Sequence, residues 1–166
     1  MGRANPLSHV SPRGRARMVD VSAKPPTRRA ASAEAWVDVG PAVARQLRKS
    51  GAVAKGNVLE SARLAGILGA KQTPYLIPMC HPLPLDVVEI DARVIGRRVQ
   101  IVATVRCEGK TGVEMEAMTA AAVAALTVYD MVKSAGKGVE IGPVRLLEKR
   151  GGASGRWNRE RADGQG

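Results

Sequence analysis

A long helix built from small apolar residues governs how this chain can pack. The stretch 117–128 consists almost entirely of alanine and other small or apolar residues. Thr111 and Glu114 occupy the N-cap and N3 positions of a capping box, so the pattern predicts a helix from about Val113 to Ser134. Because alanine lets neighbouring elements approach closely, we expect this helix to be packed in a core. The stretch is too short and too rich in alanine to span a bilayer.

The remaining apolar content has the same character. Hydrophobic residues make up 45% of the 166, and they are mostly Ala, Val and Leu, because Phe is absent and only two Trp and two Tyr occur. This content is enough for one domain with a real core, and it excludes wholesale disorder. It leaves few aromatic side chains for stacking on nucleic-acid bases.

Segments typical of β-strands surround the long helix. They are 28–39, 87–94, 99–105 and 139–147. Gly96-Arg97-Arg98 separates the second from the third and predicts a hairpin turn.

Two shorter helices are predicted between the first and second strands. One begins near Pro41 and ends at Gly51. The other covers about 58–71, with Asn57 and Glu60 at its N-cap and N3 positions. A loop punctuated by prolines is predicted over 72–85.

The order of these elements indicates the fold class. Strand, helices, strand, strand, helix and strand form the split β-α-β arrangement of an α+β, ferredoxin-like fold, an antiparallel sheet with helices packed on one face. We predict that residues 1–17 are a disordered basic tail, that 18–150 form a single domain, and that 151–166 are a flexible C-terminal tail.

Charge and cysteine content bear on the partners and the compartment. The net charge is +11, but 1–17 carry +4 and 149–166 carry +3, so the rest of the chain is only mildly basic. Solvated tails explain the terminal arginines, whereas the central lysines could attract an anion. Two cysteines form no disulfide framework, and the N-terminus has no apolar run, so we expect a cytoplasmic protein.

The end of the long helix carries a candidate catalytic pair. Asp130 and Lys133 are three residues apart, so they share one helix face. A surface ion pair of little energetic value fits the same spacing. Because the preceding turns are apolar and packed, however, this pair can present a proton acceptor and a cation to a substrate.

Two glutamates begin the same helix. Glu116 lies on the stripe of Asp130, but fourteen residues of helix span about 21 Å, so the two carboxylates cannot act on one bond within one chain. Either Glu116 is unrelated, or a neighbouring subunit brings it to Asp130. Capping alone explains Glu114.

Lys55 precedes a predicted helix within the sequence Lys-Gly-Asn. Free N–H groups at a helix start, together with a nearby lysine, favour a phosphate site. This short pattern by itself favours an ordinary surface lysine, and the glycine spacing of a Walker loop is missing.

The prolyl loop contains Met79, Cys80 and His81. A zinc site would need further ligands that the sequence does not offer, so we predict no metal. We expect His81 to orient or protonate a polar substrate, with a structural histidine as the rival interpretation.

Several motifs taken together resemble the cyclic pyranopterin monophosphate synthase family, that of the molybdenum cofactor biosynthesis protein C. The likeness covers about 18–152. The segments that carry it are 18–22, Lys55-Gly56-Asn57, 77–83, 109–117, Tyr129-Asp130-Met131 with Lys133, and 141–147. Asn57, where an aspartate often stands, and the arginine-rich tails depart from the family pattern.

The resemblance implies a lyase that converts 3′,8-cyclo-7,8-dihydroguanosine 5′-triphosphate to cyclic pyranopterin monophosphate and diphosphate, without a cofactor. It implies one catalytic domain and a homohexamer, a trimer of dimers, with active sites at subunit interfaces. The implied catalytic residues are Asp130, Lys133 and Lys55, and the implied substrate-binding residues are Met79, Cys80, His81, Met115, Glu116 and Glu114. Lys110 and Arg145 are further candidates for contacts with the triphosphate.

Two other functions fit the predicted fold. A ferredoxin-like RNA-binding module would need aromatic side chains on the sheet, and the sequence has neither Phe nor an RNP-like motif. We therefore expect no nucleic-acid partner. A small-molecule-binding regulatory module would share the fold and lack only the chemistry of the site.

Overall fold

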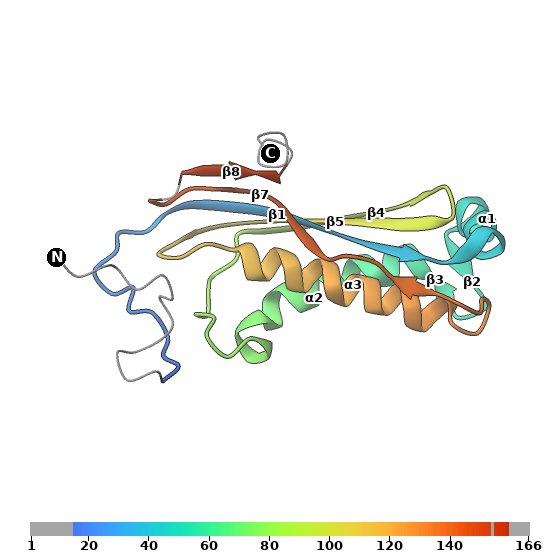
Figure 1. The fold of residues 1–166 in the computed structure, drawn as a ribbon, viewed down its shortest axis with the longest axis horizontal. Coiled ribbons are helices and arrows are strands. Elements are labelled where there is room, and N and C mark those ends of the chain that lie inside the picture. Colours follow the sequence, from blue (N-terminus) through green and yellow to red (C-terminus); the bar gives the residue numbers. More distant parts are fainter. Residues whose placement is uncertain (1–14, 154, 160–166) are drawn as a thin grey trace.

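The computed structural model describes residues 15–153 and 155–159, and six of the strands in these residues build one large antiparallel sheet (Figure 1). The order across this sheet is β4-β5-β1-β7-β8, and β6 also pairs with β1. The strands are β1 (Thr27–Asp38), β4 (Val87–Ile95), β5 (Arg98–Gly109), β6 (Glu140–Ile141), β7 (Arg145–Arg150) and β8 (Arg156–Asn158).

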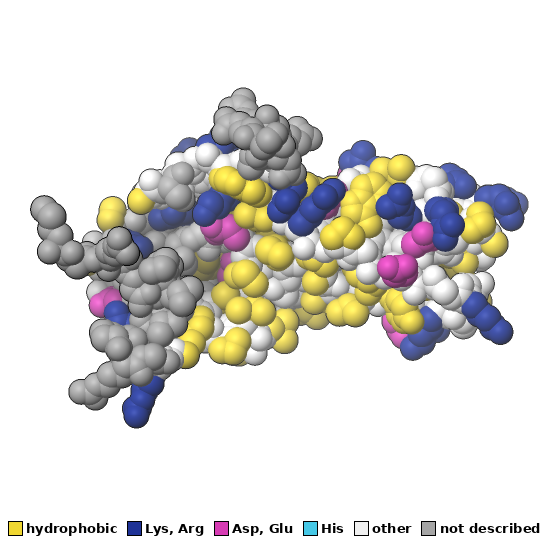
Figure 2. Space-filling model, viewed as in Figure 1, with side chains coloured by type: hydrophobic (Ala, Val, Ile, Leu, Met, Phe, Trp, Pro, Cys, Tyr) yellow, Lys and Arg dark blue, Asp and Glu magenta, His cyan; other side chains and the backbone are white. Residues whose placement is uncertain are grey.

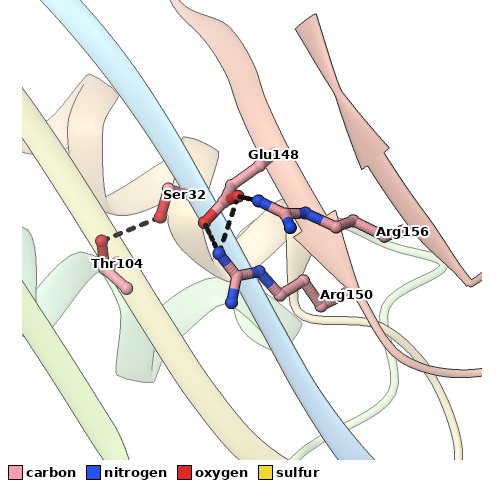
Figure 3. Close-up of polar contacts among 5 residues, drawn as sticks. All are labelled: Ser32, Thr104, Glu148, Arg150 and Arg156. Carbon is pink, nitrogen blue, oxygen red and sulfur yellow. Dashed lines mark hydrogen bonds and ion pairs between the residues drawn. The ribbon is translucent and has the colours of Figure 1, made fainter. Parts of the chain in front are cut away.

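The core lies between this sheet and two helices. On β1, the alternate residues Ala31, Ala33, Ala35 and Val37 are almost fully buried beneath the helices. The other face of the sheet is polar, as an antiparallel sheet permits. There the hydroxyl groups of Ser32 and Thr104 form a 2.9 Å hydrogen bond between β1 and β5 (Figure 3).

Charged side chains continue this polar face onto β7 and β8. The Glu148 carboxylate accepts hydrogen bonds from Arg150 at 3.2 Å and from Arg156 at 3.4 Å (Figure 3). The Arg156 pair connects β8 to β7, whereas the Arg150 pair lies within β7, and ion pairs at such a solvent-accessible position contribute little to stability.

The helices α2 (Val58–Leu76) and α3 (Glu114–Val132) cover the inner face of the sheet (Figure 1). Small residues let them approach closely: a Cβ placed on Gly69 of α2 would lie 2.9 Å from Cβ of Val123 on α3. By length and composition α3 could cross a membrane, but half of its most apolar window is buried inside the protein. The close packing predicted from the alanine-rich stretch is therefore confirmed.

A short helix and a small hairpin lie at one end of the molecule. Helix α1 (Gly40–Ser50) ends at Gly51, whose φ of +67° suits a left-handed cap. The strands β2 (Ala52–Val53) and β3 (Gly56–Asn57) then lead directly into α2. As predicted, the side chain of Asn57 caps α2 by accepting a hydrogen bond from the backbone N–H of Glu60 at 3.1 Å.

The element order confirms the ferredoxin-like α+β prediction, but several boundaries were wrong. Helix α2 continues past residue 71 to Leu76 and includes Pro74, so the loop begins later than residue 72. The predicted strand 139–147 is divided into β6 and β7. The predicted capping box at α3 does not form, because Val113 is the N-cap residue and no side chain caps the helix.

The C-terminal segment also departs from its prediction. We predicted a flexible tail over 151–166, but residues 156–158 within it form strand β8, which pairs with β7. Residues 1–14, 154 and 160–166 lie outside the described part of the chain. That residues 18–150 form a single catalytic domain stays a prediction.

Candidate active site

Three of the predicted catalytic residues meet at the C-terminal end of α3. The hairpin between β2 and β3 carries Lys55, whose Nζ donates to the backbone oxygen of Asp130 at 2.9 Å and lies 3.5 Å from Oδ2 of the same residue. From the following turn, Nζ of Lys133 lies 2.7 Å from Oδ1 of Asp130. The structure thus brings together two ammonium groups and one carboxylate from segments far apart in sequence.

The electrostatics of this cluster favour the charged forms of Asp130 and Lys133. Lys133, and secondarily Lys55, lower the pKa of Asp130, and Asp130 in turn raises the pKa of Lys133. The side chain of Asp130 remains 60% exposed, so these ion pairs contribute little to stability. A carboxylate held between two cations on an open surface is therefore better suited to receiving a ligand than to supporting the fold.

The predicted substrate-binding residues line a cavity of about 420 Å³ at the opposite end of α3. The loop after α2 contributes the Met79-Cys80-His81 segment, and its backbone is turned by a 3.0 Å hydrogen bond from the Cys80 N–H to the Ile77 oxygen. The full lining is Val19, Val21, Lys24, Met79, Cys80, His81, Leu83, Thr111, Gly112, Glu114, Met115 and Glu116.

Glu116 is the buried carboxyl group of this cavity. Its side chain is 3% exposed, and burial raises its pKa above the usual value of 4.5. Burial likewise raises the pKa of the Cys80 thiol, and the negative charge of Glu116 adds to this effect. A glutamate in such surroundings holds a proton more tightly than one in water, as a general acid must.

A basic cavity of about 590 Å³ adjoins the first one, and both are lined by Lys24, Thr111, Gly112 and Glu114. Its cationic lining residues are Lys24, Arg29, Lys110, Lys149 and Arg150. Such a concentration of ammonium and guanidinium groups suits a polyphosphate.

Of these cations, sequence reasoning had singled out only Lys110. Arg29 shares the inner face of β1 with Ala31, so an inward-facing arginine on an otherwise apolar face was the available signal. Lys149 could be found only once its pairing with Ala31 across β1 and β7 was known.

Two predicted residues have other partners than expected. Glu114 lies 3.1 Å from Nζ of Lys149, so it joins the basic cavity and does not cap α3. Arg145 lies on the outer face of the sheet, where its Nε donates to the buried carboxylate of Glu34 at 2.7 Å. Arg145 lines neither the basic cavity nor the one beside it.

Among the described residues, no group of three or more His, Cys, Asp or Glu side chains is arranged to hold a metal ion. The lysine–aspartate cluster and the two cavities lie at opposite ends of α3, which runs along the sheet (Figure 1). One copy of the chain therefore does not bring all the predicted site residues together.

Comparisons with known proteins agree with the motifs. Residues 18–152 match the MoaC family. A cyclic pyranopterin monophosphate synthase from Thermomicrobium roseum is 53% identical over 156 residues, which cover 93% of each chain. One from Streptomyces avermitilis is 54% identical over 92% of this chain and 89% of its own. One from Geobacter sulfurreducens is 52% identical over 93% and 97%.

Proposed function

This chain belongs to the MoaC family, and we propose that it acts as a cyclic pyranopterin monophosphate synthase in molybdenum cofactor biosynthesis. The substrate is 3′,8-cyclo-7,8-dihydroguanosine 5′-triphosphate, and the products are cyclic pyranopterin monophosphate and diphosphate. The observation that carries the proposal is the convergence of Lys55 and Lys133 on Asp130, at the positions that the family motifs assign to catalysis.

The reaction needs proton transfers and stabilisation of a leaving group. Opening the purine-derived imidazole ring and closing the pterin ring move protons, for which Asp130 serves as acceptor and Glu116, with its raised pKa, as donor. A ribose-derived hydroxyl then attacks the α-phosphorus, forming the cyclic phosphate as the bond to the departing diphosphate breaks. This makes the enzyme a phosphorus–oxygen lyase.

The basic cavity would hold the phosphates during this step. Lys24, Arg29 and Lys110 line it together with Lys149, which shares its charge with Glu114. Cations fixed around the leaving diphosphate stabilise the charge that develops on it. The ring system would then occupy the adjoining cavity, beside His81 and Glu116.

A second copy of the chain would complete the site. Asp130 and Glu116 are fourteen residues apart on α3, about 21 Å along a straight helix. Two copies packed with their α3 helices antiparallel would place the Asp130 end of one beside the Glu116 end of the other. A two-fold axis would form two such sites at once, and a trimer of these dimers gives the proposed homohexamer.

The outer face of the helices supports this arrangement. Large apolar side chains stand out from α2 and α3 there: Leu64 is 69% exposed, Leu68 57% and Leu126 59%. Figure 2 shows hydrophobic side chains gathered over these helices, on the side away from the sheet. An apolar surface of this kind is typical of a subunit interface. We propose that the hexamer acts in the cytoplasm.

Incubation of the purified protein with the cyclised nucleotide tests the function. Mass spectrometry should detect cyclic pyranopterin monophosphate, and a diphosphate assay should find an equal amount of diphosphate. Recovery of unchanged substrate from a folded, assembled protein would contradict the proposal. Incubation with GTP is the control and should yield neither product.

A further inference from the structure

The turn between β7 and β8 forms part of the wall of the basic cavity. Gly151 and Gly152 both line the cavity and both have positive φ angles, +98° and +74°. The turn is closed by two backbone hydrogen bonds of 3.1 Å, from the Gly151 N–H to the Gly155 oxygen and from the Gly155 N–H to the Gly152 oxygen. Strand β8 thus fixes the backbone of the turn beside the cavity.

The guanidinium group of Arg29 occupies the space that a side chain at Gly152 would need. A Cβ built on Gly152 would overlap Nη1 of Arg29 and lie 2.6 Å from its Cζ. On its other side, Nε of Arg29 donates to the backbone oxygen of Gly109 at 3.4 Å. The guanidinium is therefore held between the end of β5 and the glycine turn.

Gly155 provides an internal comparison within the same turn. Its φ of +64° is close to that of Gly152, so an alanine would be similarly strained at either position. A Cβ on Gly155, however, would have no atom within 4 Å. Only at Gly152 would the added methyl group displace the Arg29 guanidinium, which can move because it ends a flexible side chain.

We propose that Gly152 is a positioning residue: by lacking a side chain, it lets the turn hold the Arg29 guanidinium in place to bind the polyphosphate. This inference rests on the proposed function, because it takes the basic cavity as the polyphosphate site. It also gives β8 a role, since this strand anchors the turn against which Arg29 lies.

Inorganic diphosphate, titrated by calorimetry, is the direct probe. Gly152→Ala should bind it about tenfold more weakly than Gly155→Ala does, because an arginine–phosphate hydrogen bond depends on the place and orientation of the guanidinium. In steady-state kinetics Gly152→Ala should lower kcat/KM for the cyclised nucleotide by at least a similar factor relative to Gly155→Ala, because the proposed Arg29 contact acts on the phosphates both in the bound substrate and as the diphosphate leaves. Circular dichroism checks that both variants fold.

A double-mutant cycle separates positioning from a general disturbance of the turn. In an Arg29→Ala background, adding Gly152→Ala should weaken diphosphate binding no more than adding Gly155→Ala. An equal effect of the two alanines in the wild-type background would overturn the proposal. So would a loss from Gly152→Ala that persists without Arg29.

The same titration distinguishes this inference from the proposed function. If the wild type bound diphosphate but made no cyclic pyranopterin monophosphate, the proposed function would fail and the cycle would still decide the role of Gly152. If the wild type made the product but the cycle showed no coupling, only the positioning role would fail. A wild type that bound no diphosphate would overturn the positioning role as well.

Discussion

The two ends of α3 hold carboxyl groups in opposite surroundings. Glu116 in the first turn is 3% exposed, and burial raises its pKa. Asp130 near the last turn is exposed, and Lys133 and Lys55 lower its pKa. One helix thus supplies a carboxyl group whose pKa is raised by burial and another whose pKa is lowered by neighbouring lysines. In the proposed mechanism, such a pair divides the work of acid and base by environment.

Under the proposed mechanism, one copy of the chain is insufficient. The two groups are separated by about 21 Å of helix, while proton transfer needs hydrogen-bond distance or one intervening water. The opposite environments become useful together only if a neighbouring copy brings the ends into one site.

Removing the charged carboxylate should have the largest effect. We expect Asp130→Asn to lower kcat by about 10³-fold, because the amide accepts no proton at neutral pH. Product formation from the cyclised nucleotide measures the change. Circular dichroism and light scattering should match the wild type. Activity within tenfold of the wild type would show that Asp130 is not the catalytic proton acceptor.

Disrupting the apolar helix face should separate the subunits. Leu126→Glu places a charge on the exposed stripe of α3, and we expect dissociation of the assembly and at least about hundredfold lower activity. Ile95→Glu is the matched control, because Ile95 is an exposed apolar residue (44%) at the C-terminal end of β4 and not on α2 or α3. Light scattering measures the mass, and a fully active Leu126→Glu monomer would refute a shared site.

Removing one of the two lysines that contact Asp130 should weaken substrate binding. We expect Lys55→Ala to raise the dissociation constant of the cyclised nucleotide about tenfold, measured by calorimetry with Asp130→Asn present to prevent turnover. Lys49→Ala, an exposed lysine on α1, should change it less than twofold. An equal effect of both variants would show that Lys55 contributes only general positive charge and makes no specific contact with the substrate.

The raised pKa of the buried Glu116 carboxyl group should make the stability of the protein depend on pH. Because the folded state raises the pKa of Glu116, that state binds its proton more tightly than the unfolded chain does. The free energy of unfolding of the wild type is therefore lowered as the pH rises above 4.5 through the folded-state pKa.

Glu116→Gln does not ionise, so its stability relative to the wild type should increase over this pH range. Urea unfolding at pH 4, 5.5 and 7 measures the difference. Glu140→Gln, at an exposed position of β6, serves as the control. A Glu116→Gln difference that stayed constant with pH would show that burial does not perturb this carboxyl group.

Local patterns predicted most of the fold, because alternation and capping are visible in the sequence. The errors occurred where tertiary contacts override local rules. Helix α2 continues through Pro74 because Thr73 beside it is fully buried, and its hydroxyl donates to the Gly69 oxygen at 3.2 Å. Beyond β6, the Gly142 N–H still donates to the Trp36 oxygen, and Pro143, which has no N–H, then interrupts the strand.

Sequence motifs predicted part of the candidate site. Residues whose position in the site depends on the register of strand pairing were missed. Lys55, Asp130 and Lys133 stand in recognisable segments, and the structure places them together. Arg29 and Lys149 belong to the basic cavity because their strands point them inward, and no local pattern states that.

Mixing two inactive variants tests the shared site most directly. Asp130→Asn and Glu116→Gln are each expected to be inactive, and they damage opposite ends of the same helix. If every site takes Asp130 from one copy and Glu116 from another, unfolding and refolding the two together makes hybrid dimers in which one site of the two is intact. Random pairing then restores about a quarter of wild-type activity. A mixture that stayed as inactive as its parts, despite confirmed exchange of subunits, would contradict the account.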